Sequence, residues 1–199
     1  MRQHARSARI VPLALAALFV GGLSATTAAP AQARTEAQAS AKVSDAHYLR
    51  FNKGSVTNSR LELVKRTAGT DKVIKRYKAG SGQSKDTCAV GRGWLPNAGA
   101  SKPYAIEWHR KNFDGIINGL VIKIADRKCH NGTKRTELFI HSEMKPNGKS
   151  GVIESERWTN SNPNDYYSNG CIKLNPTDIR DLFKRLDSVG WPKKLYVVN

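Results

Sequence analysis

The stretch Tyr166-Tyr-Ser-Asn-Gly-Cys-Ile-Lys-Leu174 places a cysteine directly after a glycine. Gly170 permits a backbone turn that residues with a Cβ resist. In such a turn the N–H groups next to Cys171 are free to point toward a substrate oxygen. The residues therefore indicate a thiol nucleophile beside an oxyanion-binding turn. The simpler alternative is a small buried cysteine that opens a strand at residues 172–174, because free cysteine is among the most buried residue types.

Apolar runs separated by turn residues predict a mainly β domain upstream of this stretch. Residues 60–64 and 72–77 read as a hairpin around the turn at residues 68–71, and residues 80–93 read as a loop. A further element is expected to begin at Trp94. Strands are also expected at residues 104–108, 119–125, 137–141 and 195–198.

One amphipathic helix is expected after the thiol. Asn175 is a good N-cap and Pro176 suits the first helical position. Gly190 then marks the helix end. A single apolar stripe is formed by Ile179, Leu182, Phe183, Leu186 and Val189. We find no internal repeat.

A histidine at a predicted strand end is the candidate base for the thiol. His141 follows an apolar strand and precedes a long polar loop. Alone it could equally be a structural histidine, and its pairing with Cys171 is what suggests acyl-transfer chemistry. The other candidates, His47, His109 and His130, lie in the leader region, in a basic cluster and beside a cysteine that we expect to form a disulfide, so each has a simpler explanation.

Three cysteines leave one unpaired thiol in an oxidising compartment. We predict a disulfide between Cys88 and Cys129, because Cys171 occupies the reactive turn. The alternative is two buried unpaired thiols. Ligands at familiar spacings around Cys129 are missing, so we predict neither a metal site nor a cofactor.

The N-terminus has the features of an export signal. Three arginines precede an apolar run at residues 10–23, and Ala31-Gln-Ala33 fits a small-residue cleavage site. Pro12 interrupts the run, which argues against a stable membrane anchor. We therefore expect a protein that is secreted or held in the cell envelope.

The expected organisation is a signal peptide (residues 1–33), a disordered leader (34–46) and one domain (47–199). Removing the signal removes three arginines and no acidic residue, so the formal charge falls from +17 to +14. This charge favours anionic cell-wall polymers as partners, or simply a solubilising surface. Lysines and arginines are scattered rather than arranged in a stripe, so nucleic acid is not expected. The sequence makes no prediction of oligomeric state.

Two segments together resemble a known family. Phe139-Ile-His-Ser142 followed by Ser168-Asn-Gly-Cys-Ile-Lys-Leu174 resembles the signature of the L,D-transpeptidase catalytic domain (YkuD type). The resemblance is firm over residues 137–199, faint over 60–125 and absent from the leader. It implies a β-rich, sandwich- or barrel-like fold.

The resemblance also implies roles for the residues of the motif. Cys171 would be the nucleophile and His141 the base, with its ring held by the backbone carbonyl of Ser142. The N–H groups of Asn169, Gly170 and Cys171 would form the oxyanion hole. The family acts on peptidoglycan stem tetrapeptides, releases the terminal D-Ala and forms 3→3 cross-links, and carbapenems trap its members as acyl-enzymes.

The chain departs from the family signature in two places. Asn169 stands where many members have histidine, and the interval between His141 and Cys171 is longer than usual. The extra length falls in residues 144–167, a loop of the kind that often forms a lid or a binding surface. Trp158, Tyr166 and Tyr167 are candidates to line a substrate groove, and the alternative for Trp158 is that it pins the loop to the domain.

The leading hypothesis is therefore an exported peptidoglycan L,D-transpeptidase. An L,D-carboxypeptidase that uses the same acyl-enzyme, with water as acceptor, is an alternative that the sequence does not separate from it. A basic module that binds cell wall or nucleic acid, with a structural Cys171, is the non-enzymatic alternative.

Overall fold

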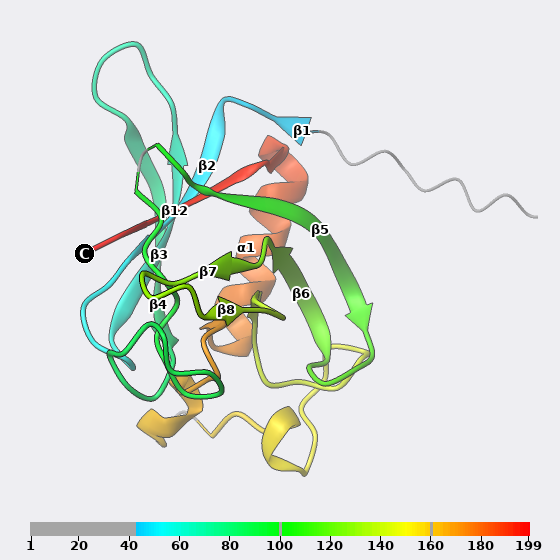
Figure 1. Cartoon of the computed structure of the whole chain (residues 1–199). Helices are drawn as coiled ribbons and strands as arrows, with labels where there is room; N and C mark the ends of the chain where they lie inside the picture. The colour runs from blue at the N-terminus through cyan, green and yellow to red at the C-terminus, as the bar shows by residue number, and fades with distance from the viewer. Residues whose placement is uncertain (1–42, 100, 160) are drawn as a thin grey trace, which may run out of the picture. The chain divides into compact units, whose positions relative to one another are not determined.

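Alternating apolar residues along the strands close a β barrel around a single core. The computed structural model describes residues 43–99, 101–159 and 161–199. Eight strands form the closed barrel in the order β10-β4-β3-β2-β12-β5-β6-β9 (Figure 1). The predicted mainly β fold with one C-terminal helix is confirmed.

The barrel strands are β2 (His47–Asn52), β3 (Ser59–Lys65), β4 (Lys72–Ser81), β5 (Tyr104–Phe113), β6 (Gly119–Ile124), β9 (Phe139–His141), β10 (Ile172–Lys173) and β12 (Lys194–Val198). Two small sheets pair β1 (Val43–Ser44) with β11 (Trp191–Pro192) and β7 (Arg127–Lys128) with β8 (Lys134–Arg135). The helices are α1 (Pro176–Val189) and the short 3₁₀ turns η1 (Glu154–Glu156) and η2 (Pro163–Tyr166).

Helix α1 joins both sides of the barrel through its apolar stripe. Four predicted stripe residues, Ile179, Leu182, Phe183 and Leu186, are buried in the same core cluster as the strands. Polar contacts reach the strands on either side: Tyr77 Oη donates to Asp181 at 2.9 Å, and Lys111 Nζ pairs with Asp187 at 2.6 Å. Figure 1 shows α1 between the β3–β4 and β5–β6 parts of the barrel.

The expectation of an element beginning at Trp94 is wrong. Within the described residues between β4 and β5 there are only isolated bridges, at Ser84–Gly93 and Ala98–Val197. The carbonyls of Gly93 and Trp94 accept hydrogen bonds from the Arg135 side chain, and Leu95 N–H donates to Ser81 Oγ. Backbone groups that a strand ladder would use are thus occupied by side chains.

The strand predicted at residues 137–141 is shorter than expected. β9 begins at Phe139, because Glu137 adopts φ 53°, in the left-handed region that strands do not contain. A non-glycine residue in this region stores backbone strain, and such residues concentrate at functional sites.

The predicted signal peptide and residues 34–42 of the predicted leader lie outside the described residues. The end of that leader, however, contains β1, which pairs in parallel with β11. Regular structure therefore begins before residue 47. No helix within the described ranges is long and apolar enough to cross a membrane.

The N-cap of α1 gives a test of the local sequence signal. Asn175 Oδ1 accepts a hydrogen bond from Asp178 N–H at 2.8 Å. Replacing Asn175 with Ala should lower the free energy of unfolding in urea by about 1 kcal/mol, because one partly buried helix N–H loses its acceptor. Asn175→Ser should retain most of the stability, and equal losses in both variants would contradict the capping role.

Candidate active site

The parallel pairing of β9 with β10 brings the predicted thiol and histidine to one face of the barrel. Ile140 faces Ile172, and His141 faces Lys173. Both isoleucines point into the core. Because side chains alternate along a strand, Cys171, His141 and Lys173 all lie on the opposite face. All three line one cavity of about 810 Å³.

The orientation of His141 is fixed by its backbone neighbour, as the motif predicts. Nδ1 lies 3.0 Å from the carbonyl oxygen of Ser142. Since a carbonyl only accepts, Nδ1 carries the proton and Nε2 keeps a free lone pair. Burial, with the charge of Lys173 as a second cause, lowers the pKa of His141 to about 4. The imidazole is therefore neutral at neutral pH and able to accept a proton.

The Cys171 thiol lies in an apolar setting. Cys171 is only 8% exposed and packs with Val121 and Phe139, with Trp108 next to them. Its Sγ donates to the carbonyl of Glu137 at 3.4 Å. The strained backbone at Glu137 thus directs this carbonyl toward the thiol. Burial raises the pKa of Cys171 to about 11, and the Phe139 N–H offsets this only in part.

The resting site is therefore a neutral thiol beside a neutral imidazole. The sequence reasoning required either a thiol of lowered pKa or a base, and the raised pKa leaves the base as the only route to the thiolate. No hydrogen bond joins Cys171 and His141 in the described part of the chain. Such contacts are often long without substrate and shorten when the substrate binds.

The turn formed by residues 168–171, here called the thiol turn, contains the three N–H groups expected to form the oxyanion hole. Gly170 N–H already donates to Ser168 Oγ at 3.1 Å. Ser168 Oγ in turn donates to the carbonyl of Cys171 at 2.7 Å, so Ser168 is an organising residue of the turn. The N–H groups of Asn169 and Cys171 have no acceptor among the described residues, which leaves two candidate donors instead of three.

Exposed apolar side chains line the cavity beside exposed polar ones such as Gln83 and Asn169. Val90, Ile116 and Ile153 line it, and all three belong to the small set of exposed large hydrophobic side chains. They come from three different loops, including the long loop at residues 144–167. Three of the five exposed large hydrophobic side chains of the described residues thus line this cavity, as is typical of a ligand-binding surface.

Of the three aromatic residues expected to line a groove, only Tyr167 lines the cavity. Trp158 packs edge-on against Tyr166, with ring centroids 4.8 Å apart. Tyr166 is itself buried, and Lys78 lies 4.5 Å from its ring centroid. Trp158 therefore pins the long loop to the domain, and Tyr166 is its anchor.

Sequence reasoning missed the buried ion pair of Lys173 with Glu143, which lines the cavity beside His141. Lys173 Nζ also donates to the carbonyl of Tyr167 at 2.9 Å. Burial raises the pKa of Glu143 despite this partner, and Glu143 Oε2 has no hydrogen bond in the described structure. Strand alternation was the available signal, since Lys173 lies two residues after Cys171 and so shares its face.

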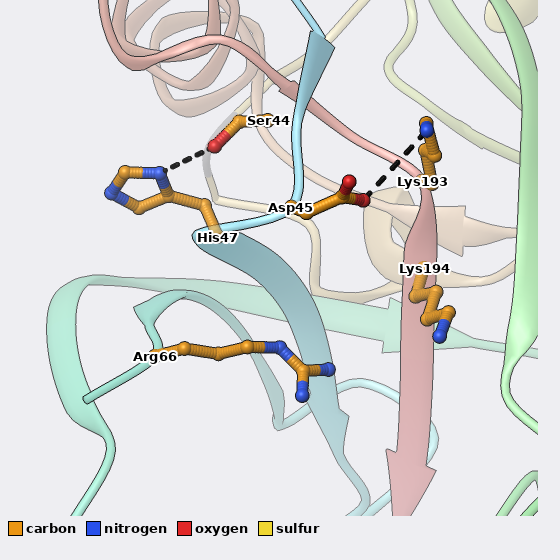
Figure 2. A pocket seen from close by; sticks show the side chains of 6 residues that line it. All are labelled: Ser44, Asp45, His47, Arg66, Lys193 and Lys194. Carbon is orange, nitrogen blue, oxygen red and sulfur yellow. Dashed lines mark hydrogen bonds and ion pairs between the residues drawn. The ribbon is translucent and has the colours of Figure 1, made fainter. Parts of the chain in front are cut away.

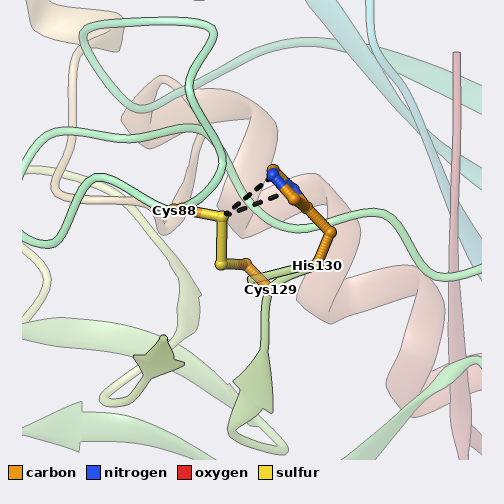
Figure 3. A group of neighbouring side chains, drawn as sticks. All are labelled: Cys88, Cys129 and His130. Atoms are coloured by element: carbon orange, nitrogen blue, oxygen red, sulfur yellow. Dashed lines mark hydrogen bonds between the residues drawn. A yellow bond between two sulfur atoms is a disulfide. The ribbon is translucent and has the colours of Figure 1, made fainter. Parts of the chain in front are cut away.

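The predicted disulfide between Cys88 and Cys129 is present, with Cα atoms 5.4 Å apart (Figure 3). His130 Nδ1 lies 3.4 Å from Cys88 Sγ. These three residues are close enough to resemble a metal-ligand set. Their two sulfurs are bonded to each other, however, and a disulfide offers no thiolate to a metal.

A second, basic pocket of about 210 Å³ lies at β2 and β12, which are far from β9 and β10 in the strand order (Figure 2). Arg66, Lys193 and Lys194 line it, together with Ser44 and His47. Asp45 is the one acidic lining residue and pairs with Lys193 at 3.8 Å. Positive charge therefore exceeds negative charge in this pocket, which favours an anionic ligand.

Comparison with protein families identifies the domain. The model of the L,D-transpeptidase catalytic domain, YkuD, matches residues 56–194. This range contains every residue that lines the cavity and does not include β1 or β2. The chain belongs to the L,D-transpeptidase catalytic domain family. Members of this family are cysteine-dependent transpeptidases that act on peptidoglycan stem peptides.

Solved structures of low sequence identity are similar to this L,D-transpeptidase domain. A solved structure of Bdellovibrio bacteriovorus Bd1075 has 12% identity and a TM-score of 0.48, and the match covers 79% of this chain and 50% of that one. A fused Zn-dependent amidase/peptidase/peptidoglycan-binding domain-containing protein from Clostridium acetobutylicum ATCC 824 has 12% identity and a TM-score of 0.38, with 76% and 51% covered. The chain thus spans about half the length of each. No curated protein sequence gave a match.

The raised thiol pKa predicts how alkylation responds to pH. The rate of Cys171 alkylation by iodoacetamide should rise about tenfold per pH unit from pH 7 to 10, because the thiolate fraction grows tenfold per unit below the pKa. Mass spectrometry should find one modified thiol in the wild type and none in Cys171→Ala. A plateau near pH 8 would contradict the buried neutral thiol, and additional reactive thiols would contradict the disulfide.

The lowered His141 pKa predicts a loss of stability in mild acid. Between the pKa in the unfolded chain, near 6.5, and the folded value of about 4, the unfolded state binds the proton that the folded state refuses. Folding stability should therefore fall as the pH drops below 6.5, by about 1–2 kcal/mol between pH 7 and pH 5. Denaturant unfolding at both pH values would measure this. His141→Gln should lose less over the same interval, and an equal loss would contradict the assignment to His141.

Proposed function

We propose that the protein is an exported peptidoglycan L,D-transpeptidase that forms 3→3 cross-links through a Cys171 thioester. The observation that carries the proposal is one cavity that holds both the Cys171 thiol and a neutral His141 with a free Nε2. A thiol and a base on one face of a cavity are the requirements for covalent acyl transfer.

In the acylation step, Cys171 Sγ attacks the carbonyl carbon of the third residue of a stem tetrapeptide. The thiol proton passes to His141 Nε2, since this nitrogen is the only unprotonated one on the ring. The developing oxyanion receives the N–H groups of Cys171 and Asn169. The C–N bond to the terminal D-Ala then breaks, and its amine leaves with the proton from His141.

In the second step, an amine of another stem peptide attacks the thioester carbonyl. His141 Nε2 accepts a proton from this amine and returns it to the departing sulfur, which restores the neutral pair. Water in place of the amine would give the carboxypeptidase product instead. The exposed apolar residues Val90, Ile116 and Ile153 support the transpeptidase outcome, because they provide binding surface for an acceptor peptide.

The positive net charge of the chain suits an anionic cell wall, where this reaction takes place. The basic pocket at Arg66, Lys193 and Lys194 is far from β9 and β10 in the strand order, so an anionic wall polymer held there would leave the cavity free. The signal-like residues 1–33 and the disulfide fit an oxidising, extracytoplasmic location.

The test is to incubate the wild type and Cys171→Ala with defined stem tetrapeptides and to follow the products by mass spectrometry. The wild type should release D-Ala and form 3→3 dimers, whereas Cys171→Ala should do neither, because no thioester forms. Release of D-Ala without dimers would indicate a carboxypeptidase. Cross-linking by Cys171→Ala would refute the enzymatic assignment.

His141→Ala tests the base separately. Its acylation rate should fall about 10²–10⁴-fold, because the thiol is then protonated at neutral pH with no acceptor for its proton. A carbapenem adduct, detected as added mass, measures this rate without an acceptor peptide. His130→Ala is the matched control, since His130 contacts the disulfide and not the cavity, and it should acylate like the wild type.

A further inference from the structure

Arg135 is a buried arginine that binds backbone carbonyls on two separate segments. It lies on β8 and is only 2% exposed. Its Nη1 donates to the carbonyls of Thr87 and Trp94, the latter at 3.1 Å. Its Nη2 donates to the carbonyls of Gly93 and Asn169, both at 3.0 Å. The first three carbonyls belong to the loop at residues 82–94, and the fourth belongs to the thiol turn.

We infer that Arg135 is a positioning residue for acylation, which holds the thiol turn so that its unpaired N–H groups face the oxyanion. This inference rests on the proposed function. Sequence analysis gave no indication of it, because a lone arginine in a short strand carries no motif.

The thiol turn packs directly against the guanidinium group of Arg135, with Gly170 at the contact. Gly170 has φ +118°, and a Cβ at this position would lie 2.2 Å from Arg135 Nη2. Because the peptide plane is rigid, fixing the Asn169 carbonyl on Arg135 also turns Gly170 N–H to the opposite side, where it meets Ser168 Oγ. Arg135 thus determines which N–H groups of the turn are consumed internally and which remain for a substrate.

The next peptide is fixed from another side. The Gly170 carbonyl accepts a hydrogen bond from Ser81 Oγ at 3.2 Å. The N–H of the same peptide belongs to Cys171 and points away from Ser81. With Arg135 on one carbonyl and Ser81 on the next, both peptides that lead to the thiol have set orientations.

The charge of Arg135 is not neutralised by an ion pair. Within the described residues no carboxylate lies at salt-bridge distance from it, and burial lowers its pKa. Burying a cation against carbonyl groups alone is costly, and a neutral side chain could fill the same volume. Its planar fork can satisfy four carbonyls at fixed angles, which an ammonium group cannot do.

The disulfide fastens the loop at residues 82–94 to the hairpin of β7 and β8, which carries Arg135. Cys88 directly follows Thr87, whose carbonyl binds Arg135. Cys129 directly follows β7, and β7 pairs with β8 so that Arg127 faces Arg135. The covalent bond therefore holds the loop whose carbonyls accept from Arg135 against the hairpin that carries the guanidinium (Figure 3).

The experiment compares two reactions of the same thiol. A carbapenem needs the oxyanion donors: Sγ bonds to the lactam carbonyl carbon, the ring C–N bond breaks, and the thiol proton ends on the ring nitrogen. Iodoacetamide needs none: Sγ bonds to the methylene carbon and iodide leaves, with the thiol proton released to solvent. A general loss of folding slows acylation and also changes the alkylation rate, because it alters the exposure of the thiol. A thiol turn whose N–H groups point in the wrong direction slows acylation alone.

Arg135→Lys keeps the charge, and Arg135→Gln keeps two N–H donors without it. In each, carbapenem acylation should fall about 100-fold, the usual effect of losing one oxyanion donor, with iodoacetamide alkylation within about threefold of the wild type. Arg127→Lys is the matched control, because Arg127 faces Arg135 and also donates to backbone carbonyls, those of Lys102 and Pro103, without reaching the thiol turn. It should acylate like the wild type.

Several outcomes would overturn the inference. These are wild-type acylation in Arg135→Lys, a loss in Arg135→Gln alone, or equal changes in acylation and alkylation. A wild type that takes up no carbapenem would count against the proposed function instead. Arg135 is then judged by the amide NMR signals of Asn169, Gly170 and Cys171. These signals should shift in Arg135→Lys and stay in place in Arg127→Lys, and unchanged signals in Arg135→Lys would refute the positioning role.

Discussion

The parallel pairing of β9 with β10 is the constraint on which the site depends. It is only two residues long, yet it closes the barrel, because β10 lies between β9 and β4. Its inward residues, Ile140 and Ile172, belong to the core that also receives α1. The outward residues are then necessarily those of the cavity. The same short strand pairing therefore sets both the packing of the core and the geometry of the site.

The electrostatics of the site follow from burial. Both the thiol and the imidazole lose contact with water, and burial favours the neutral form of each, so the pKa of Cys171 rises while that of His141 falls. A resting thiolate–imidazolium pair would instead carry the free-energy cost of burying two charged groups. In the proposed function, Cys171 stays protonated until a substrate binds and His141 accepts the thiol proton. The nearby cations Lys173 and Arg135 favour the thiolate, and the charge of Lys173 also favours the neutral form of His141.

Much of the fold could be predicted because local signals and tertiary packing agree. The hairpin of β3 and β4, the apolar strand β6 and the capped helix α1 each carry their own periodicity or turn residues. The disagreements occur where long-range contacts override local preference. Trp94 does not start a strand because Arg135, far along the chain, takes its carbonyl. Glu137 leaves the strand conformation, and its carbonyl faces the thiol of Cys171.

The sequence by itself determined the family, the mainly β class, the free cysteine and the histidine that lines the same cavity, since a motif and hydrophobic periodicity are written in neighbouring residues. Only the tertiary structure decided which N–H groups of the thiol turn are free, which aromatic residues line the cavity, and that Arg135 and the Lys173–Glu143 pair adjoin the thiol. These properties depend on side chains that meet from distant segments. Hydrogen bonds between residues far apart in the sequence produce no periodic pattern, because each requires only one residue at each of two positions.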